Sequence, residues 1–332
     1  MTGGNVQPIE YWNPVGWAWK RMVDILFRPF NIEKWFVMGF AAFIAGSNLG
    51  GGGGNGGGNS FSSDDFTSSA ESSSSGDWSF PDFWAEYAPV VIPAVVIIIL
   101  ILFALFLLFA WLKARGTFIF LDNVVQNQAA IVEPWKKYRK QGNSLFWWNL
   151  AVGFIAVAIL LMLAVACALM VWPMFTNQTN IPMGIIGIVF GITALLMYGL
   201  FFGYLGMFVH DFVAPVMMKH DLRIREAWGM FGPLLKENWG KFLLYGLVRY
   251  LVLIGVNMAY FAICLLTCCC FLLLTVIPYL GTVLLLPAHV FIRLLGPEFL
   301  QQFGDDFTLE TDTPENNVEL TIPPPAPEPE SI

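Results

Sequence analysis

The sequence predicts an all-α polytopic integral membrane protein with six transmembrane helices. Hydrophobic residues make up 57% of the 332 residues and charged residues only 12%, whereas soluble domains are about 25% charged. Long stretches without a basic residue run from Phe36 to Leu112, Gln141 to Met218 and Tyr250 to Ile292. All 17 Lys and Arg residues can therefore lie on one side of a membrane. Because basic loops stay in the cytoplasm, we expect both termini inside.

Residues 1–30 are predicted to form a cytoplasmic N-terminus with an amphipathic helix. The apolar positions at helical spacing are Trp12, Val15, Trp19, Met22, Leu26 and Phe30. Lys20, Asp24 and Arg28 recur on another face, and Pro14 suits a first helical turn. This pattern is typical of an interfacial elbow helix that lies on the membrane surface, where its cations meet anionic headgroups.

Residues 31–296 form the predicted membrane domain. Its expected spans lie at about 33–48, 89–112, 146–172, 183–209, 242–274 and 282–295. The first span, at roughly 16 residues, is short for a hydrocarbon core about 30 Å thick, so a re-entrant turn is the alternative there. The second consists of 24 uncharged residues rich in Val, Ile, Leu and Phe and is unambiguous.

Two segments are predicted to be disordered. The Gly- and Ser-rich outer loop, residues 49–88, cannot bury enough apolar surface to offset its chain entropy. Its glycine run has neither the following Lys nor the strand-to-helix context of a phosphate-binding loop. The acidic, Pro-rich tail, residues 297–332, is expected to be extended and cytoplasmic.

The cysteines and histidines do not predict a metal or cofactor site. The five cysteines lie in apolar stretches, as Cys167, Cys264 and the run Cys268–Cys270. Consecutive positions on a helix point about 100° apart and cannot close a tetrahedral site. None of the three histidines has metal-ligand spacing. We expect no metal and no cofactor, and the role of the cysteine run stays open.

Two connectors of similar sequence indicate an internal repeat. Glu133-Pro134-Trp135 and Glu226-Ala227-Trp228 each lie among cations and lead into a predicted span. The N-terminal helix is a looser third copy. The sequence thus suggests three units, each an elbow helix followed by a membrane hairpin. The alternative is that any basic, aromatic helix beside a membrane has this composition.

The connector from Lys113 to Asp122, together with Glu133-Pro134-Trp135, Gly142-Asn143 and Glu226-Ala227-Trp228, resembles an uncharacterised family of bacterial six-helix membrane proteins. That family is distantly similar to the membrane domain that precedes some glycerophosphoryl diester phosphodiesterases. The resemblance covers roughly Trp12 to Gly304 and implies only a membrane architecture. The sequence shows no alternation of strands and helices that would form a phosphodiesterase barrel.

Five ionisable residues form a candidate intramembrane polar cluster: Arg115, Asp122, His210, Asp211 and Arg249. Charges inside membrane segments are costly, so each is a functional hypothesis. At 1.5 Å per residue, Asp211 and Arg249 each lie about 12 Å inside a flanking lysine, and we expect them to pair. Asp122 lies on the same helical face as Arg115 and can join them. The pair either fixes helix register or forms part of a phosphate or lipid-headgroup site.

Catalysis is not expected, because the sequence has no nucleophile elbow and no paired carboxylates within its spans. The leading hypothesis is a non-enzymatic protein of the bacterial plasma membrane that organises or senses the bilayer and contacts anionic headgroups. The first alternative is a transporter or channel for a small solute, and the second is an accessory subunit of a lipid-related membrane enzyme. Nucleic acid is not an expected partner, while the ligand, the protein partners and the oligomeric state stay open.

Overall fold

The computed structural model describes residues 10–46, 80–176, 181–267, 271, 274–275, 277 and 279–309. The regular structure within these residues is helical, as predicted. The helices are α1 (Asn13–Phe27), α2 (Ile32–Ile44), α4 (Phe80–Val125), α5 (Val132–Lys137), α6 (Arg139–Thr176), α7 (Ile181–Phe208), α8 (Ala214–Lys219), α9 (Ile224–Glu237), α10 (Trp239–Leu266), α12 (Leu280–Leu284) and α13 (Leu286–Leu300). A π-helical turn, η2 (Val209–Val213), joins α7 to α8, and the 3-10 turns η3 (Gln301–Phe303) and η4 (Asp305–Phe307) follow α13.

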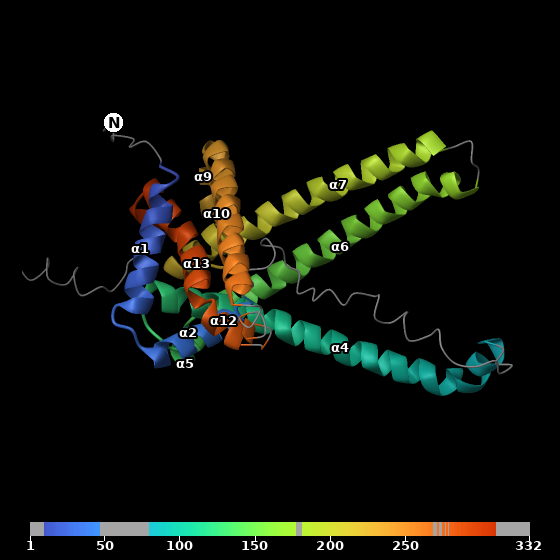
Figure 1. The fold of residues 1–332 in the computed structure, drawn as a ribbon, viewed down its shortest axis with the longest axis horizontal. Coiled ribbons are helices and arrows are strands. Elements are labelled where there is room, and N and C mark those ends of the chain that lie inside the picture. Colours follow the sequence, from blue (N-terminus) through green and yellow to red (C-terminus); the bar gives the residue numbers. More distant parts are fainter. Residues whose placement is uncertain are drawn as a thin grey trace, which may run out of the picture.

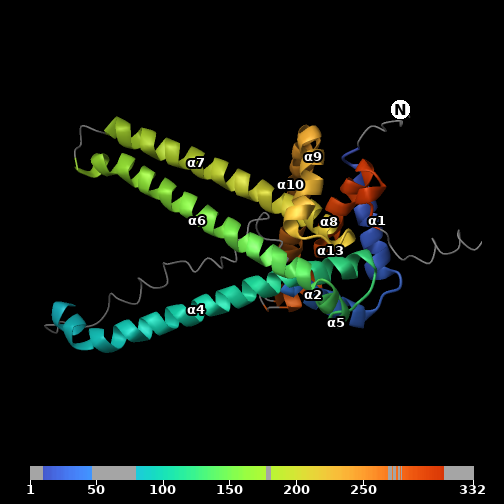
Figure 2. The same ribbon diagram turned by 180° about the vertical axis from the view of Figure 1, so that it is seen from behind.

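Four segments of the described chain are long and apolar enough to cross a membrane: Val91–Val125, Arg139–Trp172, Gly184–Lys219 and Trp239–Leu266. α4 and the pair α6 and α7 project from one side of a helical core, as Figure 1 and the view from behind in Figure 2 both show. α10 runs across the base of these helices. Most side chains between Ile92 and Phe109 are exposed apolar groups. Such surfaces suit contact with lipid, so the chain is a membrane protein.

The first and sixth predicted spans correspond to shorter helices packed in the core. α2 has 13 residues and lies along the end of α4, where a Cβ added at Gly116 would lie 2.6 Å from the backbone nitrogen of Ala45. The sixth is divided at Leu285 into α12 and α13. Four of the six predicted spans therefore match a long helix.

The structure corrects the predicted boundaries of both disordered segments. α4 begins at Phe80, inside the predicted loop 49–88, with Pro81 at a position that favours helix initiation. The tail predicted from residue 297 is ordered through Phe307, because Phe299 packs with its ring centroid 4.5 Å from that of Tyr245. Composition marked residues 298–307 as acidic tail, but their aromatic side chains anchor them to the core. The run Cys268–Cys270 lies outside the described residues.

The N-terminal helix α1 is confirmed, although its buried face differs from the predicted stripe. The side chains buried against the core are Pro14, Ala18, Met22, Ile25 and Leu26. Trp12, Trp19 and Phe30 are instead 64%, 57% and 60% exposed. α1 packs mainly against α13, so the first and the last long elements of the core lie side by side. The exposed aromatic side chains remain available to the membrane interface.

An aromatic cluster organises the core where α7 ends. The ring centroid of Phe212 lies 5.4 Å from that of Phe231 and 5.0 Å from that of Phe242. Phe299 lies 5.8 Å from Phe242. These four side chains are fully buried and come from η2, α9, α10 and α13. The cluster therefore fixes the elements that carry the candidate polar residues.

Candidate functional site

His210 and Asp211 lie in the π-helical turn η2, where the helix widens by one residue. The amide of Ala214 donates to the carbonyl oxygen of Val209, a separation of five positions. The next residue, Pro215, has no amide hydrogen to donate. The carbonyl oxygen of His210 therefore lacks its helical donor and accepts instead from Arg293 Nη1 at 3.0 Å. Turns of this kind are frequent at functional sites.

The predicted pairing of Asp211 with Arg249 is confirmed. Arg249 Nε forms the ion pair with Asp211 Oδ2, and Arg249 Nη2 donates to Oδ1 at 3.3 Å. Tyr245 donates a further hydrogen bond to Asp211 Oδ2 at 3.0 Å. The side chains of Asp211 and Arg249 are 3% and 10% exposed. This carboxylate thus accepts two hydrogen bonds, one from Tyr245 and one from Arg249, and the ion pair with the same guanidinium neutralises its charge.

Cations outnumber carboxylates around this turn. Three cations lie close enough to His210 for their charges to act on its imidazole: Lys113, Arg249 and Arg293. Arg293 donates to two backbone carbonyls, those of His210 and, at 3.4 Å, Thr117. Among the described residues, no carboxylate lies within 4.0 Å of the cationic group of Lys113 or Arg293. The region therefore carries a net positive charge that Asp211 does not neutralise.

Arg115 lies apart from the Asp211 pair, against two tryptophans. Its guanidinium carbon is 4.3 Å from the ring centroid of Trp111 and 5.0 Å from that of Trp135. Nη2 donates to Asn143 Oδ1 at 3.1 Å, and that oxygen also accepts from Trp111 Nε1 at 3.2 Å. Gly142 makes this approach possible, since a Cβ there would lie 2.8 Å from Arg115 Cγ. Cation–π contact and one amide hold the arginine in place.

Asp122 does not join Arg115, contrary to the expectation from their shared helical face. Tyr138 donates to Asp122 Oδ1 at 2.7 Å, and Lys137 Nζ lies 4.0 Å from the same oxygen. Seven residues of α4 separate Arg115 from Asp122 by about 10 Å along the axis, which exceeds contact distance. The predicted single cluster is therefore three separate groups, centred on Asp211, Arg115 and Asp122.

No three His, Cys, Asp or Glu side chains in the described part of the chain lie close enough together to hold a metal ion.

The comparison with protein families gives a match over residues 13–301 to a family of unknown function, DUF7544. The chain belongs to this family. No curated protein and no solved structure matches it. The relationship to phosphodiesterase membrane domains thus stays a prediction.

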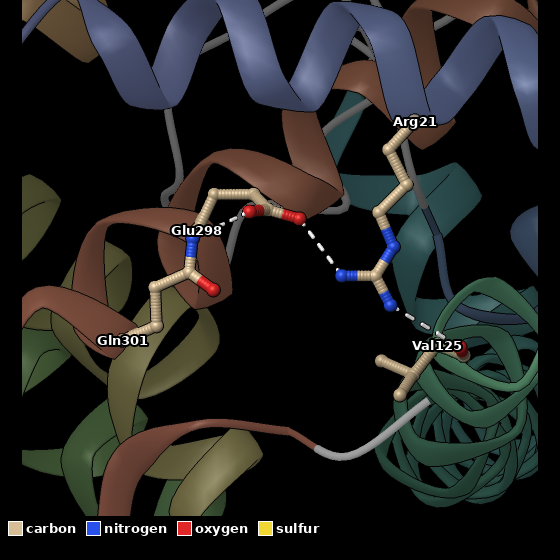
Figure 3. Close-up of polar contacts among 4 residues, drawn as sticks. All are labelled: Arg21, Val125, Glu298 and Gln301. Carbon is tan, nitrogen blue, oxygen red and sulfur yellow. Dashed lines mark hydrogen bonds and ion pairs between the residues drawn. The ribbon is translucent and has the colours of Figure 1, made fainter. Parts of the chain in front are cut away.

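The DUF7544 match covers a further polar contact that the sequence did not suggest, the ion pair between Arg21 and Glu298. Arg21 Nη1 lies 2.8 Å from Glu298 Oε1, and Gln301 donates to the other carboxylate oxygen at 2.7 Å (Figure 3). Arg21 Nη2 also donates to the carbonyl oxygen of Val125 at 3.3 Å (Figure 3). One side chain therefore connects α1, α13 and the end of α4.

Two residues of this DUF7544 protein were missed as site candidates. Arg293 lies inside the predicted span 282–295, and an arginine in a predicted span is a signal in itself. Glu298 was assigned to the tail by composition, although the apolar residues around it continue the helix. The pairing of Arg21 with Glu298 across 277 residues has no local signal.

Proposed function

We propose that this chain is a six-span, non-enzymatic protein of the bacterial plasma membrane, with both termini in the cytoplasm, that binds anionic lipid headgroups. The Arg21 contact supports six crossings. It places α1 beside Val125, the last residue of α4, at the basic end of that helix. The first residue of α4, Phe80, lies at the opposite end. If α4 spans the bilayer, the chain between α1 and α4 must cross it as well.

The threefold repeat remains part of this proposal. α5 precedes α6 and α9 precedes α10, and each short helix packs a tryptophan near the base of a long one. Trp135 lies 5.7 Å from Trp111, and Trp228 lies 6.1 Å from Trp148, between ring centroids. Elbow helices of this kind would hold aromatic and basic side chains at headgroup level.

The observation that carries the lipid proposal is the uncompensated positive charge where the exposed apolar surface of α4 ends. Phe109 is 64% exposed, whereas Ala114 is 1% exposed. Lys113 and Arg115 lie at this boundary, and neither has a carboxylate within 4.0 Å among the described residues. Low-dielectric surroundings make a cation without a counter-charge costly. The phosphates of anionic lipids lie at the headgroup level of a bilayer and can supply the missing counter-charge.

A lipid titration tests this proposal. Thermal unfolding of the detergent-purified protein should shift upward with phosphatidylglycerol, and much less with phosphatidylcholine. Anionic phospholipid should also copurify in mild detergent. Equal responses to the two lipids would overturn the headgroup proposal.

Cysteine labelling in intact cells tests the topology. A probe at Lys137 or Lys236 should be protected, and one at Thr179, which lies outside the described residues, should react from outside. Reaction at position 137 in intact cells would contradict the six-span arrangement.

A transporter or channel is the second candidate, and the π-helical turn favours it. Buried Asp211 lies in an irregular turn of a helix long enough to span, and ionisable groups at such places mark solute or proton pathways in many carriers. Passage of a small solute or protons into proteoliposomes, lost in Asp211→Asn, would establish this reading. Absence of flux with intact lipid selectivity would exclude it.

A further inference from the structure

Arg115 is only 7% exposed, and its guanidinium is held by two tryptophans and one amide while one of its nitrogens has no protein partner. Trp111 and Trp135 contact it, while Nε and Nη2 face Asn143 Oδ1 at 3.4 and 3.1 Å. Nη1 has no hydrogen-bond partner among the described residues, and it is not completely enclosed by protein atoms. By contrast, Arg293 Nε is sealed in the core without a partner. Arg115 therefore keeps unused donor capacity at Nη1.

The surroundings of this unpartnered nitrogen are positive. Arg139, the first residue of α6, lies within electrostatic range of Arg115. The amino end of α6 approaches directly, because Gly142 packs against Arg115. A helix amino terminus carries about half a positive charge. Asp122, the acidic residue nearest along α4, already accepts from Tyr138 and lies near Lys137. Two positive side chains and a helix terminus thus lack an acidic partner among the residues that the structure describes.

We propose that Arg115 binds a phosphate-class oxyanion, supplied by the phosphodiester of an anionic lipid. A guanidinium fixed in orientation donates well to planar or tetrahedral oxyanions, and more selectively than an ammonium group. Trp111 and Trp135, which contact the guanidinium, are half-buried, so part of each ring remains at the surface. Tryptophan prefers the headgroup level of a bilayer. A lipid phosphate over Arg115 would meet a cation and two aromatic rings at once.

The site lies at the depth that a lipid phosphate reaches. Arg115 follows Phe109, the last exposed large apolar side chain of α4, by six residues, or about 9 Å along the helix. The preceding stretch from Ile92 faces outward along α4. The Asp211 pair is less suited, since its carboxylate already neutralises Arg249. Arg115 is therefore the member of the predicted cluster that can bind an anion without first breaking an ion pair.

This inference rests on the proposed headgroup binding and names its ligand site. The experiment measures the thermal shift of the purified full chain with dihexanoyl phosphatidylglycerol, dihexanoyl phosphatidylcholine or inorganic phosphate. It is run at about 1 M salt, where the Debye length is about 3 Å and general surface attraction is screened. The variants are Arg115→Gln, Arg115→Lys and the matched control Lys136→Gln, which removes an exposed cation from the neighbouring helix α5.

Wild type and Lys136→Gln should respond to phosphatidylglycerol at similar concentrations. Arg115→Gln should require about tenfold more, and Arg115→Lys an intermediate amount, because charge-assisted bidentate bonds are the strong ones. Should Arg115→Gln not fold, Arg115→Lys alone decides. A response unchanged in the folded Arg115 variants would overturn the site while leaving headgroup binding intact. Wild type that does not distinguish phosphatidylglycerol from phosphatidylcholine would overturn the proposed function itself. A response to inorganic phosphate equal to that of phosphatidylglycerol would refute the lipid source.

Discussion

Arg293 of α13 donates to the carbonyl oxygen of His210 in the π-helical turn over 3.0 Å. Arg293 replaces the hydrogen-bond donor that the carbonyl oxygen of His210 lacks within its own helix. Pro215 has no amide hydrogen, and the amide of Ala214 is taken by Val209, so the oxygen of His210 must find a donor outside its own helix. Arg293 provides it and reaches Thr117 with its second amino group. The irregular turn and the arginine on another helix therefore depend on each other.

Replacing Arg293 with lysine should destabilise the protein although the charge is kept. Lysine presents one ammonium group and cannot donate to His210 and Thr117 in the same fork geometry. Leaving one buried carbonyl unpaired costs about 1–3 kcal/mol. Thermal unfolding in detergent measures the loss. A variant as stable as wild type would show that water replaces the missing donor.

Asp211 and Arg249 should be strongly coupled in a double-mutant cycle. Asp211→Ala leaves the 10%-exposed Arg249 without its carboxylate, and breaking a buried pair on one side typically costs about 3–5 kcal/mol. Removing both should cost less than the sum of the single changes. The comparison uses unfolding free energies of the four proteins in one detergent. Strict additivity would mean that the observed pair contributes nothing as a pair.

Gly296→Ala should separate α13 from the π-helical turn. A Cβ at position 296 would clash with the backbone oxygen of Asp211 and lie 2.7 Å from the Asp211 Cβ, and overpacking of this kind costs about 1–3 kcal/mol. Gly229→Ala on α9 is the matched control, since nothing lies within 4 Å of the added atom. There alanine should stabilise by up to about 1 kcal/mol. Similar unfolding temperatures for both variants would contradict the close packing of α13.

Tyr138 should make the protein sensitive to alkali. Burial, followed by the hydrogen bond to Asp122, raises the pKa of the Tyr138 hydroxyl well above its usual range. Because the folded-state pKa lies above the unfolded value near 10, this contribution to stability is complete below about pH 10 and lost at higher pH. Stability should fall by an extra 1.4 kcal/mol or so per pH unit above that value. Unfolding measured from pH 9 to 11 should show a shallower decline for Tyr138→Phe, and parallel declines would disprove the assignment.

Sequence predicted the helical class and the four long apolar helices because both follow from local patterns of hydrophobicity and charge. It also predicted the pair of Asp211 and Arg249, since charges at matching depths in neighbouring spans have few alternative partners. It did not predict that Asp122 would choose Tyr138 over Arg115, because that choice depends on how α5 folds back beside α4. The order of Phe299 and Leu300 was missed because it too depends on contacts with elements distant in the sequence. They begin a segment whose overall composition is acidic and Pro-rich, and the aromatic cluster from three other elements gives these two apolar side chains a place to pack.

The contact between Arg21 and Glu298 joins residues that are 277 positions apart. At a synthesis rate of 5–20 residues per second, roughly 14 to 55 seconds pass between the emergence of the two partners. Throughout that interval the apolar face of α1, with Ala18, Met22 and Leu26, has no α13 to cover it. Until α13 has been synthesised, α1 must lie on the membrane surface or be bound by a chaperone. Ribosome stalling or truncation ahead of α13 would therefore leave the apolar face of α1 uncovered. Such a chain would be a good substrate for membrane quality-control proteases.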